Sequence, residues 1–197
     1  MDLPDIHVDE LKQDKEFLAN IERLEKECKE EESLTKGYQL LDAKLIIEAP
    51  EDDINEIFSF IVNRAFDILA DKLVSSQKFD MSDSENLNCA RAIYEHGIQK
   101  YSENDKTGAK EIFLILYYTI DNEILKESMM VHAVSVMSDI SFEKFIEDMV
   151  DSEKIDENDP FVFFIQNFTK KREDLLKDMD KYVKKAIKEL EAFENSK

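Results

Sequence analysis

The chain has 197 residues, a length typical of one domain with or without extensions. Only three glycines and three prolines occur, too few for the tight turns of a many-stranded sheet, so the composition predicts an all-α fold. The formal net charge of −20 argues against nucleic acid and an anionic membrane surface as partners, because both would repel the chain.

The first predicted helix covers residues 9–32, where apolar side chains recur every three or four positions among charged ones. A break or kink is expected between Ser33 and Gly37, after which the apolar stripe resumes. Pro50 ends this run and suits the first position of the next helix, because its fixed φ is already helical. Residues 51–75 carry a dense apolar pattern that predicts a well-buried helix.

The middle of the chain is expected to hold a buried central helix. Ser82 and Glu85 form a capping-box pattern that predicts the start of the preceding helix. Residues 112–120 include one polar side chain in nine, so we interpret about 105–126 as a helix that is apolar nearly all round and surrounded by other helices. Two shorter helices are expected after it, at 129–140 and from Ser141 onwards.

The C-terminal part begins with an acidic connector at 151–159. Asp159 followed by Pro160 is a strong helix-start signal, which predicts one long helix to about residue 194. The prediction is a helical bundle with two long amphipathic terminal helices. It divides the chain into an N-terminal amphipathic segment (1–50), a compact bundle (51–152) and a C-terminal helix (159–197) that packs on the bundle or on the N-terminal helix.

The two terminal segments differ in charge. Residues 9–32 hold ten acidic and five basic side chains, whereas residues 170–188 hold eight basic and four acidic ones. Complementary flanking charges favour pairing of these two helices with each other, as in a coiled coil. The alternative is that 170–188 presents a basic surface to an acidic partner.

Motifs for bound metals and phosphates cannot be written in this sequence. None of His7, His96 and His132 follows a glutamate by three positions, as carboxylate-bridged metal bundles require. Cys28 and Cys89 form no zinc pair, and the three glycines cannot make a phosphate-binding loop. We therefore expect no metal and no cofactor. Two distant cysteines and an acidic start that is unlike a secretory signal favour a cytoplasmic location.

We expect a non-catalytic protein–protein interaction protein: an adaptor, a regulatory subunit or a small acidic chaperone. Its partner would be another protein or a second copy of the chain, bound through the terminal helices, with neither nucleic acid nor membrane involved. The residues expected to contact the partner are Ile21, Leu24, Phe168, Leu175, Met179 and Tyr182.

The alternative hypothesis is a small enzyme with an acid/base pocket inside the bundle. Carboxylates and histidines can transfer protons when burial shifts their pKa values. The candidate catalytic residues are Glu95, His96, Glu123, Glu127 and His132. This hypothesis requires them to converge around a cavity.

Overall fold

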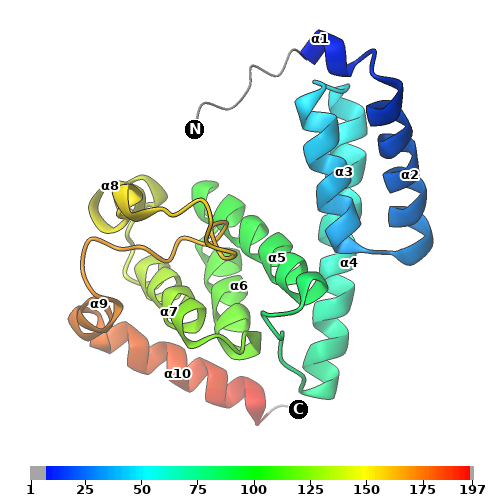
Figure 1. Cartoon of the computed structure of the whole chain (residues 1–197). Helices are drawn as coiled ribbons and strands as arrows, with labels where there is room; N and C mark the ends of the chain where they lie inside the picture. Colours follow the sequence, from blue (N-terminus) through cyan, green and yellow to red (C-terminus); the bar gives the residue numbers. More distant parts are fainter. Residues whose placement is uncertain (1–7, 196–197) are drawn as a thin grey trace. The chain divides into compact units, whose positions relative to one another are not determined.

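The computed structural model describes residues 8–195 of the chain (Figure 1). Among these residues the regular secondary structure is helical and β-pairing is limited to isolated bridges, so the predicted all-α fold is confirmed. His7 lies outside the described residues. The helices are α1 (Val8–Leu11), α2 (Lys15–Glu31), α3 (Leu34–Ile46), α4 (Glu51–Ser75), α5 (Ser84–Ser102), α6 (Lys106–Thr119), α7 (Glu123–Met137), α8 (Phe142–Met149), a 3₁₀ turn η1 (Ser152–Lys154), α9 (Arg172–Asp178) and α10 (Asp180–Glu194).

The chain divides into two compact units, an N-terminal unit (1–71) and a C-terminal unit (72–197). Helix α4 begins in the first unit and its last residues belong to the second. The three segments expected from the sequence, and the pairing of the two terminal helices, remain predictions.

In the N-terminal unit, α2, α3 and α4 pack around a small apolar core. Asp14 starts α2 by accepting hydrogen bonds from the backbone amides of Glu16 and Phe17, so the predicted helix 9–32 is interrupted near its start. Ser33 caps α3 in the same way. Gly37 lets α3 approach α4 closely, because a Cβ there would lie 3.0 Å from the side chain of Ile61. The core consists of Ile21, Leu24, Leu40 and Ala43, with Phe17, Ile47 and Ile57 packed against it.

The start of α5 corrects the predicted capping box. The side chain of Asp83, and not that of Ser82, accepts the hydrogen bond from the backbone amide of Asn86 at 2.8 Å. The Ser82 hydroxyl instead donates to Asp80. Gly97 then allows α6 to pack against α5, since a Cβ at this position would lie 2.8 Å from Ile112.

The expected central helix at 105–126 is wrong in extent, because two helices occupy this region. Helix α6 ends at Thr119, and Ile120 forms an isolated parallel bridge with Phe79. The Phe79 amide donates to the Thr119 carbonyl at 2.7 Å. The last residue of α6 is therefore hydrogen-bonded to the segment before α5 and not to a further helical turn. Asn122 then caps α7 by accepting from the Leu125 amide. The helix expected at 129–140 is therefore the later part of α7.

Burial is most complete in α7, whose residues 128–136 are all buried. Helix α6 packs between α5 and α7, and α10 packs against both α6 and α7 (Figure 1). Helix α8 begins at the predicted cap Ser141.

The prediction of one helix from Pro160 to about residue 194 is wrong. Residues 159–171 form a non-helical segment, which we call the strap, before the short α9 and the longer α10. Asp159 does cap a turn, accepting from the Phe161 amide at 2.8 Å. The chain does not continue as a helix, because the Thr169 amide donates to the Met149 carbonyl and the Asn167 carbonyl accepts from the Asp151 amide. Phe164 and Phe168 of the strap are buried.

Candidate functional site

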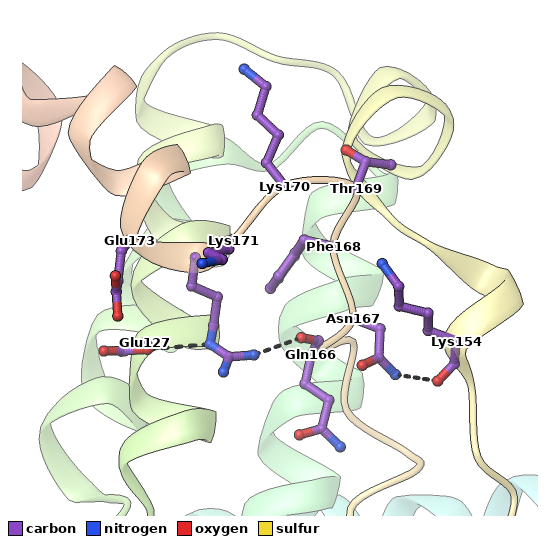
Figure 2. A pocket seen from close by; sticks show the side chains of 10 residues that line it. Glu127, Lys154, Gln166, Asn167, Phe168, Thr169, Lys170, Lys171 and Glu173 are labelled. Carbon is purple, nitrogen blue, oxygen red and sulfur yellow. Dashed lines mark hydrogen bonds and ion pairs between the residues drawn. The ribbon is translucent and has the colours of Figure 1, made fainter.

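The strap borders an open, polar hollow with a volume of about 540 Å³. In Figure 2, Glu127 and Glu173 lie on one side of this hollow and Lys154 on the opposite side, with the buried Phe168 between them. The residues that line the hollow are Glu127, Lys154, Gln166, Asn167, Phe168, Thr169, Lys170, Lys171, Arg172 and Glu173.

Two hydrogen bonds fix the guanidinium of Arg172 at the hollow. Its Nε donates to the Glu127 carboxylate of α7 at 3.2 Å, and its Nη1 donates to the Gln166 backbone carbonyl at 3.0 Å (Figure 2). On the other side of the hollow, the side-chain Nδ2 of Asn167 donates to the Lys154 backbone carbonyl at 3.0 Å. The strap is thus tied to α7 and to η1, which holds the wall of the hollow in one conformation.

Basic side chains outnumber acidic ones among the residues that line the hollow, although the chain as a whole is strongly negative. Four basic and two acidic residues line it, a net of +2. Lys154 pairs with Asp151 at 2.6 Å and lowers the pKa of that carboxyl, and Lys170 pairs with Asp178 at 3.0 Å. The Lys171 ammonium has no acidic partner among residues 8–195. Lys171 is therefore the cation of this hollow that an anionic group could pair with directly.

Beneath the strap, His132 belongs to a buried aromatic cluster. Its ring centroid lies 4.8 Å from that of Phe145, 4.9 Å from that of Phe113 and 5.5 Å from that of Tyr94. Burial lowers the pKa of His132 to about 4, because the apolar surroundings disfavour the charged ring. Burial also raises the pKa of the Tyr94 hydroxyl. Both groups are neutral near pH 7, and their role here is to hold the core together.

A second concave surface, which we call the α6–α10 groove, is mostly apolar and has a volume of about 310 Å³. The rings of Tyr118 and Phe193 meet edge to face across it, with centroids 5.8 Å apart. Lys110 of α6 bonds Glu189 of α10 at 2.8 Å and ties the two helices together. The residues that line the groove are Glu111, Leu114, Ile115, Tyr118, Glu189, Leu190 and Phe193.

The five candidate catalytic residues occupy different environments. Glu95 pairs with Arg91, Glu123 with Lys126, and Glu127 with Arg172. His132 is buried, whereas His96 is half-buried on α5, near Asp105. Glu127 is the member of the set that lines the hollow, where its carboxylate accepts from Arg172 and so positions that side chain.

The six expected partner-binding residues serve mainly as internal packing. Ile21 and Leu24 lie in the core of the N-terminal unit, and Phe168 and Leu175 are buried in the C-terminal unit. Met179 and Tyr182 are half-buried. The residues that line the hollow and the groove were largely missed. The run Lys170-Lys171-Arg172 in an acidic chain was the available signal for the hollow.

Within residues 8–195, no group of three or more His, Cys, Asp or Glu side chains is arranged to hold a metal ion. No helix in this described range is long and apolar enough to cross a membrane. Comparisons with protein-family models, curated proteins and solved structures found no match, so the function is inferred from the geometry alone.

Proposed function

We propose that this protein is a non-catalytic interaction protein that binds an amphipathic helix of a protein partner in the α6–α10 groove. The observation that carries the proposal is an open apolar groove beside the terminal helix α10. An apolar groove between two helices is a common receptor for the apolar face of a third helix.

The groove offers apolar surface that the chain itself leaves partly uncovered. Ile115 and Tyr118 of α6, and Leu190 and Phe193 of α10, are all half-buried. A docked helix would remove their remaining surface from water, at about 25 cal/mol for each Å² of apolar area. The two aromatic rings are suited to anchor such a contact, because large rigid side chains dominate binding energy at interfaces.

The charge around the groove favours a partner helix flanked by basic residues. Glu111 lies at the edge and has no ion-pair partner among the described residues, whereas Glu189 on the opposite helix is already paired with Lys110. The formal net charge of −20 adds a long-range attraction for cationic partners, which raises the association rate more than the final affinity.

The proposal fits an adaptor, a regulatory subunit or a small acidic chaperone. A cytoplasmic location is part of the proposal, because the sequence has only two cysteines, Cys28 and Cys89, which lie far apart in the chain. The enzyme hypothesis gains less support, because the two histidines of its catalytic set have different environments and His132 is enclosed by aromatic rings.

The test uses a designed helical peptide with leucines along one face and lysines on both flanks. Its binding to the full chain is measured by fluorescence anisotropy, beside a peptide in which glutamates replace the lysines. We expect saturable binding of the basic peptide, at least tenfold weaker binding of the acidic one, and loss of binding in Ile115→Lys and Leu190→Lys variants.

Val74→Lys is the matched control, because Val74 is 88% exposed and does not line the groove. Light scattering of the free chain tests the other possible occupant of the groove, which is a second copy of the chain. A dimer that Leu190→Lys dissociates would assign the groove to a second copy of the chain instead of a partner helix. Absence of both peptide binding and dimerisation would reject the groove as a docking site.

A further inference from the structure

We propose that the hollow beside the strap binds a dianionic phosphate group, carried by a phosphorylated protein segment or by a small phosphorylated molecule. This site is separate from the α6–α10 groove, because the two share no lining residue. Its ligand chemistry is also different, since the groove is mostly apolar and the hollow is polar and lined by four basic side chains.

Arg172 provides a preorganised donor for an anion. Its Nε and Nη1 are each held by one protein acceptor, Glu127 and the Gln166 carbonyl. A guanidinium carries five N–H donors, and the remaining ones have no acceptor among residues 8–195. Because the two existing bonds fix the plane of the group, a phosphate could bind the free donors without ordering the side chain first.

The three lysines around Arg172 can supply further contacts. Lys171 lacks an acidic partner among the residues described, so its ammonium is available to a ligand. Lys170 and Asp178 form a pair in which both side chains are about 60% exposed. Exposed ion pairs contribute little to stability, so Lys170 can exchange its carboxylate for a phosphate at small cost.

Charge and size favour a phosphate over a single carboxylate. The lining residues carry a net charge of +2, and Asp151 and Asp178 beside them pair with two of the lysines. A phosphate monoester carries nearly two negative charges near pH 7, so it competes with these carboxylates for the lysines better than a single carboxylate would. The volume of about 540 Å³ lies within the range of small-molecule sites and leaves room for the group that carries the phosphate. The side-chain amides of Gln166 and Asn167 donate to Asp159 and to the Lys154 carbonyl, and so help to hold the wall of the hollow in place.

The experiment is a calorimetric titration of the full chain with four probes at low ionic strength. The probes are inorganic phosphate, phenyl phosphate, a short phosphoserine peptide, and the same peptide with glutamate in place of phosphoserine. We expect saturable binding of the phosphate-bearing probes and binding of the glutamate peptide that is at least tenfold weaker. Preference for the phosphopeptide would identify a protein source, and equal binding of phenyl phosphate a small-molecule source.

The variant Lys171→Gln should weaken binding about fivefold to tenfold, which is the loss expected for one charge-assisted hydrogen bond. Lys171→Arg should restore most of the affinity. Lys177→Gln is the matched control, because it removes one positive charge from α9 outside the hollow. Equal weakening by Lys171→Gln and Lys177→Gln would show that binding depends only on the overall charge of the chain, and would overturn the proposal. The absence of saturable phosphate binding would also overturn it.

Discussion

The Tyr94 hydroxyl and the His132 ring form a buried hydrogen bond of 3.1 Å between Oη and Nε2. His132 Nδ1 lies 2.7 Å from the Ser128 carbonyl oxygen, which can only accept, so Nδ1 carries the proton. Nε2 of the neutral ring is then the acceptor and the Tyr94 hydroxyl is the donor. The Tyr94 oxygen accepts in turn from the Ile165 amide of the strap at 3.0 Å. This chain of bonds joins α7, α5 and the strap.

The first prediction concerns the pH dependence of stability. The pKa of His132 falls from 6.5 to about 4 on folding, so the unfolded chain binds the proton more readily than the folded one. The stabilising effect of the neutral ring is complete above pH 6.5. It should decrease as the pH falls, by about 3 kcal/mol in total when pH 4 is reached. Denaturant unfolding across this range measures the change.

His132→Gln is the informative variant for this effect, because glutamine does not titrate. It should flatten the dependence between pH 6.5 and 4, whereas His96→Gln should leave it in place. Carboxylates with lowered pKa values, such as those of Asp105 and Asp139, lose their stabilising partners only at still lower pH. An unchanged slope in His132→Gln would show that other groups control the acid sensitivity.

The second prediction is that Tyr94→Phe destabilises the C-terminal unit by about 2 to 4 kcal/mol. The change removes the partner of the buried His132 Nε2 and of the amide of the half-buried Ile165, and an unsatisfied buried group costs about 1–3 kcal/mol. Hydrogen exchange at the Ile165 amide should also become faster. Tyr117→Phe is the control, since Tyr117 is only half-buried and its ring contact with Lys126 needs no hydroxyl. Similar losses in both variants would contradict the proposed chain of bonds.

Elements defined by local signals were predictable from the sequence, and those defined by distant contacts were not. Helix α4 begins and ends where predicted, because Pro50 and three acidic residues mark its start and a long apolar stripe continues to Ser75. The end of α6 depends on Phe79, which is distant in sequence, and the apolar residues on both sides hid the cap at Asn122.

The strap illustrates the same difference. Phe164 and Phe168 are four residues apart, a spacing that a helix would share, but both side chains are drawn into the aromatic cluster around His132 and Tyr94. The basic side chains at the hollow could have been anticipated from the run Lys170 to Arg172. The shape of the hollow could not have been predicted, because Glu127 of α7 and Lys154 of η1 are distant in sequence and come together only in the folded chain.

The third prediction distinguishes the observed start of α5 from the predicted one. Asp83→Ala should lower the free energy of unfolding by about 1 kcal/mol, because the backbone amide of Asn86 loses its cap. Ser82→Ala should have a much smaller effect, since the Ser82 hydroxyl bonds only the exposed Asp80 carboxylate. Urea unfolding of the two variants decides the question. A larger loss of stability in Ser82→Ala than in Asp83→Ala would support the capping box predicted from the sequence.

The last prediction tests whether the strap is part of the core. Phe168→Ala should cost about 3 to 5 kcal/mol, the usual range for removing a buried phenyl ring, because Phe168 packs edge to face on His132 and Phe145. Phe163→Ala, also in the strap, is the matched control. Its ring is 48% exposed and the Arg91 guanidinium lies over it, 3.4 Å from the ring centroid, so a loss of about 1 kcal/mol is expected. Thermal and urea unfolding measure both losses. If the two variants lose equal stability, the strap does not bury Phe168, and the wall of the hollow is not fixed by the core.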